Sequence, residues 1–296
     1  MANIVGTASS DSLTGTSSAD SIDGLAGDDI LAGGPGNDTL NGGAGYDIAD
    51  YSNAGGPVMV DLAAGTASGA DGNDVLISIE DVWGSNFDDI LIGNALDNIL
   101  WDDQGNDTLV GGLGDDTMEG GAGIDTAGFS GSSGLYGISH SGFTLNVSGP
   151  DGADTLFDIE RLQFSDTNLA FDLERGEAAG NAVRLIGAAF GNQYLTPEVI
   201  GIVVDIFDAG YSLPQVSEAA IATMGFPNNP EFVRMIYRNV VDADPLPETE
   251  ASLVGLLAGS GGGMTQAQML EIVLNLDINE NHINIVGMQQ NGVEFA

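Results

Sequence analysis

The chain has 296 residues, of which 44 are Asp or Glu and 5 are Lys or Arg, so its formal net charge is −39 at pH 7. This charge excludes nucleic-acid binding, because neutralising phosphates needs clustered basic side chains. The chain has no cysteine, so disulfides cannot stabilise it. No apolar run approaches the roughly 18 residues that a membrane-spanning helix needs. The length allows one elongated domain or two compact ones.

A nine-residue template, Gly-Gly-x-Gly-x-Asp-x-Leu-x, recurs in two blocks. Its copies start at Gly6, Gly15, Gly24, Gly33 and Gly42, and again at Gly84, Gly93, Asp102, Gly111 and Gly120. The sixth position is Asp11, Asp20, Asp29, Asp38 and Asp47, then Asp89, Asn98, Asp107, Asp116 and Asp125. A flexible linker could share this Gly/Asp-rich composition, but it would not keep acidic and apolar positions in phase. The period of nine predicts a calcium-binding parallel β-solenoid, or β-roll.

Each part of the template has a physical role. The glycines allow a tight turn whose carbonyls converge, and the strand that follows directs its Leu inward. Two repeats make one coil, so we expect residues eighteen apart to stack, for example Asp11, Asp29 and Asp47. Stacked carboxylates and turn carbonyls are oxygen ligands of the kind that Ca²⁺ prefers. The predicted ligands are the sixth-position aspartates together with Gly27, Gly36, Gly45, Gly105, Gly114 and Gly123. The repeats that start at Gly6, Gly15, Gly84 and Gly93 lack most of these glycines and are alternatively coils without metal.

A longer repeat contains the first. The blocks start 84 − 6 = 78 residues apart, and residues 69–80 closely parallel residues 149–160. Each unit of about eighty residues has five nonapeptides, an apolar connector such as 58–62, and an isolated Gly-x-Asp-Gly-x-Asp copy. That copy adds Asp74 and Asp154 as candidate ligands, and the apolar segments 75–83 and 155–164 are expected to be strands that lengthen or cap the solenoid.

Residues 6–173 resemble the repeats-in-toxin, or haemolysin-type, calcium-binding proteins. The resemblance extends to Asp50-Tyr51-Ser52 after the first block and to residues 159–166 after the second. It implies an extracellular or cell-surface protein that is exported unfolded by type I secretion machinery and folds in external calcium. Residues 1–6 have neither the basic nor the apolar region of a cleaved signal peptide. The tail 292–296, an acid followed by apolar residues, is similar to an uncleaved C-terminal secretion signal.

From residue 173 the composition becomes that of an all-α domain, so we expect a β-roll over 1–172 and a helical domain over 173–296. About six helices are expected, over 177–190, 197–209, 216–224, 230–240, 249–257 and 266–274. Thr265 and Gln268 form a candidate capping box. The segment 232–241 resembles a helical domain that is often appended to such repeats in bacterial surface proteins. Arg234 and Arg238 could form a partner-binding patch, or be paired with nearby acids.

The sequence contains no motif of a hydrolase or of a nucleophilic enzyme: it has no His-Glu-x-x-His, no Gly-x-Ser-x-Gly and no cysteine. Its two histidines are His140, in an expected hairpin turn at 139–142, and His282, near the end of a helix. The leading hypothesis is therefore a secreted, non-enzymatic protein stabilised by several Ca²⁺ ions that forms a homo-oligomer or polymer, such as an S-layer, filament or matrix. The alternative is a calcium-dependent adhesin or carbohydrate-binding module.

Overall fold

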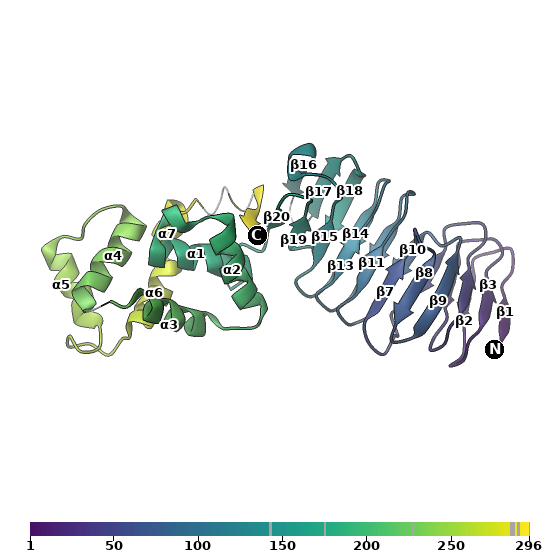
Figure 1. Cartoon of the computed structure of the whole chain (residues 1–296), viewed down its shortest axis with the longest axis horizontal. Helices are drawn as coiled ribbons and strands as arrows, with labels where there is room; N and C mark the ends of the chain where they lie inside the picture. The colour runs from purple at the N-terminus through teal and green to yellow at the C-terminus, as the bar shows by residue number, and fades with distance from the viewer. Residues whose placement is uncertain (142–143, 175, 227, 285–287, 289–290, 296) are drawn as a thin grey trace. The chain divides into compact units, whose positions relative to one another are not determined.

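The computed structural model describes residues 1–141, 144–174, 176–226, 228–284, 288 and 291–295. Internal contacts divide the chain into two units, Met1–Thr167 and Asn168–Ala296, shown in Figure 1 in purple to teal and in green to yellow. The sequence places its boundary between residues 172 and 173. The strand at 168–170 lies in the second unit, where it pairs with the C-terminal strand.

The first unit contains a three-residue strand in each of the ten nonapeptides, and one more such strand lies just before the first of them. In chain order these strands are β1 (Asn3–Val5), β2 (Ser12–Thr14), β3 (Ser21–Asp23), β4 (Ile30–Ala32), β5 (Thr39–Asn41), β6 (Ile48–Asp50), β11 (Ile90–Ile92), β12 (Ile99–Trp101), β13 (Thr108–Val110), β14 (Thr117–Glu119) and β15 (Thr126–Gly128). The middle residue of each strand points inward, because successive side chains of a strand face opposite sides. Leu31, Leu40, Leu91 and Leu109 are fully buried there.

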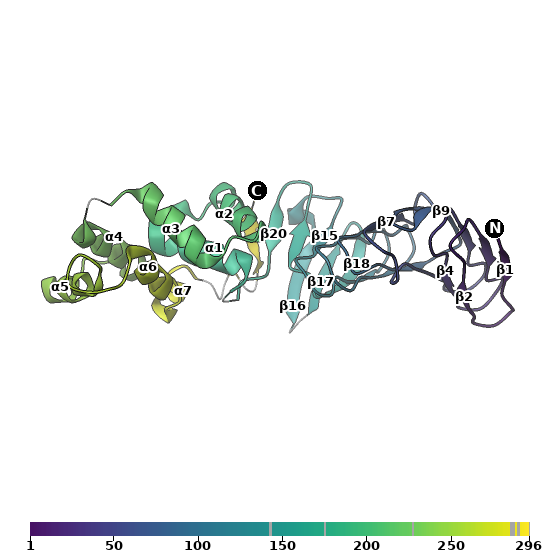
Figure 2. The ribbon, with the colours of Figure 1, turned by 90° about the horizontal axis from the view of Figure 1, so that it is seen from below.

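Successive nonapeptide strands alternate between two sheets (Figures 1 and 2). In the first unit, the first sheet has the order β1-β3-β5-β9 (Gly72–Ile77)-β8 (Thr66–Gly69)-β7 (Val58–Asp61)-β11-β13-β15-β19 (Arg161–Gln163). The second has the order β16 (Gly137–Ser141)-β17 (Thr144–Gly149)-β18 (Gly152–Phe157)-β14-β12-β10 (Asp81–Trp83)-β6-β4-β2. The nonapeptide strands pair in parallel with residues eighteen apart, as in Ile22↔Leu40 and Leu91↔Leu109. The predicted parallel β-roll, with two repeats to a coil, is confirmed.

A three-stranded meander follows each block of nonapeptides. The first consists of β7 (Val58–Asp61), β8 (Thr66–Gly69) and β9 (Gly72–Ile77), and it lies in the first sheet. The second consists of β16 (Gly137–Ser141), β17 (Thr144–Gly149) and β18 (Gly152–Phe157), and it lies in the second sheet. A short 3₁₀ turn, Ser133–Leu135, precedes the second meander. The duplicated units therefore place their meanders in opposite sheets.

Two expectations for these segments are wrong. Residues 75–83 and 155–164 are not continuous strands, because a turn separates β9 from β10 (Asp81–Trp83) and β18 from β19 (Arg161–Gln163). Ser78 and Asp158, with φ of 50° and 47°, reverse the chain at these turns in a left-handed conformation that non-glycine residues rarely adopt. The expected hairpin turn at 139–142 is also displaced, since His140 lies within β16; Gly142 is outside the described residues.

The second unit is helical, as expected. Its elements are β20 (Asn168–Ala170), α1 (Ala178–Phe190), a 3₁₀ turn (Asn192–Tyr194), α2 (Pro197–Asp208), α3 (Leu213–Met224), α4 (Asn229–Val241), α5 (Pro247–Leu256), α6 (Gln266–Leu274), α7 (Asp277–His282) and β21 (Val293–Phe295). The capping box of Thr265 and Gln268 is present at the start of α6. The apolar face of α4, carrying Phe232 and Ile236, is buried in the core against α1 and α6.

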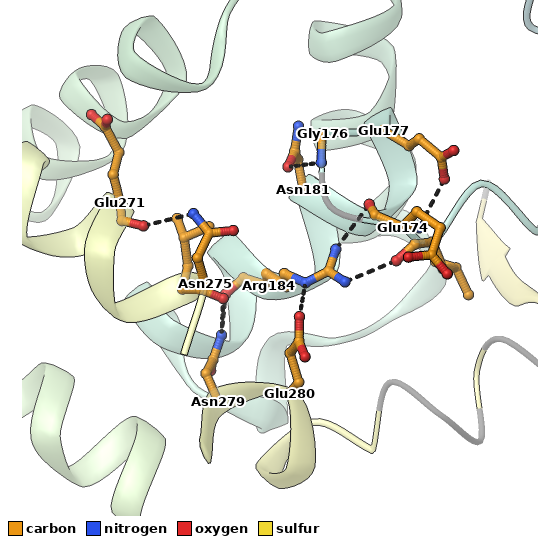
Figure 3. Close-up of polar contacts among 11 residues, drawn as sticks. Glu174, Gly176, Glu177, Asn181, Arg184, Glu271, Asn275, Asn279 and Glu280 are labelled. Carbon is orange, nitrogen blue, oxygen red and sulfur yellow. Dashed lines mark hydrogen bonds and ion pairs between the residues drawn. The ribbon is translucent and has the colours of Figure 1, made fainter. Parts of the chain in front are cut away.

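Three described arginines of this unit form ion pairs. Arg184 of α1 is buried, and its guanidinium donates to Glu280 Oε1 at 3.0 Å and to the carbonyls of Leu173 and Glu174 (Figure 3). Arg234 bonds Glu250 at 2.7 Å, and Arg238 bonds Asp244. The alternative that Arg234 and Arg238 are paired with nearby acids is thus the one observed. No helix among the described residues is long and apolar enough to cross a bilayer.

Candidate metal centre

The sixth-position aspartates form rows that cross the coils of the roll. In each row one carboxylate oxygen, Oδ1, accepts the backbone N–H of the aspartate one coil earlier. The N···O distances are 2.7 Å for Asp11 to Asp29, 2.7 Å for Asp20 to Asp38, 2.8 Å for Asp29 to Asp47 and 2.8 Å for Asp107 to Asp125. The eighteen-residue stacking expected from the template therefore fixes the position and direction of each carboxylate.

The other carboxylate oxygen, Oδ2, divides the aspartates into two groups. In the strong repeats it is buried and has no hydrogen-bond partner among the described residues. These aspartates are Asp29, Asp38, Asp47, Asp107, Asp116 and Asp125, all at most 2% exposed. A buried carboxylate oxygen without a partner is costly, whereas a bound cation would satisfy it. The unpaired oxygens are therefore where a metal ion fits.

In the weak repeats the protein itself fills the corresponding position. Asp11 Oδ2 accepts from the N–H and hydroxyl of Thr7, at 2.5 and 2.9 Å, and Asp20 Oδ2 accepts both groups of Thr16 at 2.7 Å. The N–H of Ser85 likewise donates to Asp89 Oδ2, while its hydroxyl donates to Asp89 Oδ1. Each donor stands where the template has its second glycine, so a hydroxyl-bearing residue at this position marks a repeat whose carboxylate is already satisfied.

Asp20 of the weak repeats and five aspartates of the strong repeats have pKa values shifted in opposite directions. Hydrogen bonds from Ala2 and Thr16 lower the pKa of Asp20 to about 2. Burial raises the pKa of Asp116 to about 6 and that of Asp125 to about 8, with neighbouring carboxylates adding to the shift. Burial likewise raises the pKa of Asp38 and Asp47. A positive ion beside these groups would favour their ionised form.

Glycine at the first template position leaves space beside each carboxylate. A Cβ on Gly24 would lie 2.3 Å from Asp29 Oδ2 and 2.6 Å from the carbonyl oxygen of Gly42, and a Cβ on Gly33 would lie 2.6 Å from Asp38 Oδ2. Any side chain there would fill the space into which the carboxylate and a turn carbonyl point. The first glycine thus keeps a cradle of oxygen atoms open.

The fourth-position glycines, which the sequence predicts as carbonyl ligands, stack on one another between coils. The carbonyl oxygen of Gly27 would lie 2.0 Å from a Cβ on Gly45, and that of Gly105 would lie 1.5 Å from a Cβ on Gly123. Gly36 and Gly114 make equally close approaches to the meander glycines at 72 and 152. Only glycine permits this spacing, which lines up a second set of carbonyls along the turns.

The two isolated Gly-x-Asp-Gly-x-Asp copies supply the last carboxylate of two aspartate rows, Asp74 after Asp38 and Asp154 after Asp116. Asp74 Oδ1 accepts the N–H of Asp38 at 2.8 Å while its Oδ2 accepts the hydroxyl of Tyr51 at 2.9 Å, so both oxygens have protein partners. Asp154 Oδ1 accepts the N–H of Asp116 at 3.0 Å. As metal ligands, these two residues stay a prediction.

The other two rows end in glutamates that the template does not reveal. Glu80 accepts the N–H of Asp47 at 3.0 Å, and Glu160 accepts that of Asp125 at 2.9 Å. Both follow an Ile after a Ser or Asp, in the parallel segments 69–80 and 149–160. This shared motif is the signal that could have identified them.

Asp102 is a further residue that sequence reasoning missed. It replaces the first glycine of its repeat, is 1% exposed, and has an Oδ2 with no hydrogen-bond partner among the described residues. Both of its carboxylate oxygens lie 2.5 Å from where a Cβ on Gly84 would be. Burial, followed by the charges of Asp107 and Asp89, raises its pKa to about 9. An acid at a glycine position of the template was the available signal.

The oxygen ligands along the turns come from both carboxylates and backbone carbonyls, a combination that suits Ca²⁺. Within the described ranges, no group of three or more His, Cys, Asp or Glu residues could hold a metal ion. Aspartate oxygens from the coils and turn carbonyls are instead the oxygen ligands available, and Ca²⁺ takes 6–8 oxygens, backbone carbonyls included, in flexible geometry. The residues present therefore fit calcium.

Comparison with known families agrees with this geometry. A model of the RTX calcium-binding nonapeptide repeat matches four stretches, residues 3–31, 14–49, 83–118 and 92–127. These stretches are RTX repeats. The matched RTX repeats contain all ten sixth-position residues, so calcium binding by this part of the chain rests on both its sequence family and its unpaired carboxylates.

No curated protein matches the chain. Among solved structures, the chain is similar to the extracellular lipase LipA from Serratia marcescens, with 19% identity and a TM-score of 0.24. The matched region covers 53% of this chain and 37% of the lipase, so the chain spans well under half the length of that protein.

Proposed function

We propose that this protein is a secreted, non-enzymatic structural protein that assembles with copies of itself at or beyond the bacterial cell surface, as an S-layer, filament or matrix. The observation that carries the proposal is the set of six buried, unpaired Oδ2 atoms in the strong RTX repeats. They make the roll dependent on Ca²⁺, which is scarce in a cytosol and abundant outside it. RTX repeats are a calcium-binding motif rather than a catalytic one.

Calcium would act as a switch for folding. Without it, like charges on adjacent coils oppose stacking, and three-residue strands bury too little to offset the entropy of ordering the chain. When bound, the ions neutralise the rows and stabilise the folded roll by mass action. Sites in extracellular modules bind at about 10⁻⁴ to 10⁻³ M, so a low-calcium cytosol would keep the chain unfolded for export.

The C-terminal tail supplies the proposed export signal. Residues 293–295 form β21, which pairs with β20, and Val293 is buried in the helical unit. A signal that lies in a strand of the folded unit is readable by type I machinery only before that unit folds. This order of events matches export of an unfolded chain.

Calcium titration of the purified full chain tests the proposal at two levels. Circular dichroism should show β structure appearing cooperatively as calcium rises, and light scattering should show particles growing beyond a monomer in millimolar calcium and dispersing in chelator. A roll already folded in excess chelator at pH 8, where the buried carboxyls are largely ionised, would refute the folding switch. A monodisperse monomer in both conditions would refute self-assembly.

A second candidate function, a calcium-dependent adhesin or carbohydrate-binding module, is favoured by one surface feature. Trp83 and Trp101 are paired in register on β10 and β12, with ring centroids 5.5 Å apart, and Trp101 is 45% exposed. Ile99 is exposed beside them on β12. The exposed indole ring of Trp101, with the half-buried Trp83 beside it, offers a stacking surface for a sugar ring. A glycan array with Trp101→Ala as the matched control separates this function from assembly.

A further inference from the structure

The roll contains one junction between its two duplicated units. There β7, the first strand of the first meander, pairs in parallel with β11 of the second block, with Met59↔Ile90, Val60↔Leu91 and Asp61↔Ile92 opposite each other. The backbone N–H of Leu62 continues this pairing to the carbonyl of Ile92 at 2.8 Å. A meander strand and a nonapeptide strand are therefore compatible neighbours in this fold.

The two ends of the roll carry the counterparts of these strands. β2 corresponds to β11, because 12 + 78 = 90 in the duplication. β16 corresponds to β7, since each is the first strand of a meander. When the two meanders are aligned on Gly69 and Gly149, the pair Val60↔Ala67 of the first corresponds to the pair Ile138↔Val147 of the second. As far as the described residues go, β16 and β2 are the two end strands of the second sheet.

The directions of the end strands also agree with the internal junction. β17 is antiparallel to both β16 and β18, so β16 runs in the same direction as β18. β18 is parallel to β14 and, through the ladder, to β2. A second copy translated along the sheet would thus bring its β2 beside β16 in parallel, as β11 lies beside β7.

Burial shows that the core is less complete at these ends. At the internal junction, Val60 and Leu91 are both 0% exposed. Their counterparts, Ile138 and Leu13, are only half-buried. A neighbouring copy would cover both side chains, which gives the contact an apolar driving force.

The two end strands lack carboxylates, as do most of the nonapeptide strands, so negative charge on the strands does not oppose their pairing. In a chain of net charge −39, β2 (Ser-Leu-Thr) and β16 (Gly-Ile-Ser-His-Ser) contain no carboxylate. Edge strands that must stay unpaired are usually protected by charged side chains or proline, and these two strands have neither.

We propose that β16 of one copy pairs in parallel with β2 of the next, placing Gly137, Ile138 and Ser139 opposite Ser12, Leu13 and Thr14. The partner is a second copy of this chain, and the contact repeats the β7–β11 junction between molecules. Because the two faces differ, the contact is head-to-tail and leaves an open end for further growth. The inference rests on the proposed self-assembly and identifies its interface.

Cysteine cross-linking tests the register, since the natural chain has no cysteine. Thr14 and Ser139 are exposed and would lie opposite each other, at the roughly 4.8 Å spacing of paired strands, within reach of a disulfide. Full-length T14C and S139C chains, mixed in calcium under mild oxidation, should give a covalent dimer. Neither variant alone should cross-link, and chelator should abolish the product.

A shifted pair provides the matched control. Ser12 and Ser139 would lie two residues out of register, about 8 Å apart, too far for a disulfide. A mixture of S12C and S139C should therefore cross-link far less than the T14C and S139C mixture. Equal cross-linking of the two mixtures, or cross-linking of T14C alone, would overturn the interface. If light scattering shows assembly in calcium while no in-register dimer forms, the interface is wrong and self-assembly stands; if no assembly occurs, both fail.

Discussion

Asp38 and Asp20 lie one coil apart in the same row and differ in what their second oxygen contacts. Asp38 Oδ2 is buried without a hydrogen-bond partner in the described part of the chain, whereas Asp20 Oδ2 accepts two bonds from Thr16. Asn substitution keeps the Oδ1 of each residue as an acceptor and replaces Oδ2 by an amide. We expect Asp38→Asn to remove a calcium ligand and Asp20→Asn to remove only local hydrogen bonds.

The size of the effect follows from mass action. An ion that binds only the folded state stabilises it by about 2.7 kcal/mol when calcium is at a hundred times its dissociation constant, and by almost nothing far below it. Asp38→Asn should therefore lose up to about 2.7 kcal/mol at high calcium. At low calcium its loss should vanish or reverse, because the substitution also removes a buried carboxylate whose pKa is raised by burial.

The assay is urea unfolding at a series of calcium concentrations. At saturation, each ion coupled to folding adds one unit to the slope of the logarithm of the folding constant against that of calcium concentration. Asp38→Asn should reduce this slope by about one unit. Asp20→Asn should lower the free energy of unfolding but leave the slope unchanged. Equal loss of slope in the two variants would refute the division between metal-satisfied and protein-satisfied repeats.

Three further predictions follow from groups already described. Burial raises the pKa of Asp125 to about 8 in the folded roll, from an ordinary value of 3.8. The calcium-free roll should therefore be most stable at low pH and lose stability as the pH rises toward 8. Circular dichroism in chelator checks this, and an opposite trend would contradict it. Asp102→Gly, which restores the template residue, should increase β structure in chelator at pH 8, because it removes a buried carboxyl; loss of β structure would count against this. Arg184→Met should destabilise the helical unit by about 3–5 kcal/mol in thermal unfolding, since it removes a buried ion pair with Glu280 and two hydrogen bonds to backbone carbonyls. Arg238→Met, at an exposed pair, should cost at most about 1 kcal/mol.

The roll could be predicted from the sequence because one residue type dominates each template position. Glycine is needed where coils approach closely, as at Gly45 and Gly123, and an apolar residue is needed at the centre of every strand, as at Leu40. These requirements repeat every nine residues, so period alone reveals the coils and their stacking. The capping box at Thr265 was predictable for a similar reason, since it depends on local chemistry.

The period of nine does not predict the two meanders, the turns at Ser78 and Asp158, or the buried carboxyl of Asp102. Strands β7 and β16 have no template glycines, and their pairing depends on partners distant in sequence. The turns at Ser78 and Asp158 use residues that rarely adopt positive φ, so nothing in the residue types announces them. Asp102 stands at a glycine position of the template, but only the structure shows that its carboxyl is buried beside the row of sixth-position aspartates.

The placement of the meanders has a consequence for the curvature of the roll. Among the described strands, three (β9, β8 and β7) separate β5 from β11 in the first sheet, while β10 alone separates β6 from β12 in the second. At about 4.8 Å for each strand, the first sheet is longer there by about 10 Å, so the coils must fan apart on that side. The roll is therefore wider on the side of its first sheet at the junction between the two duplicated units.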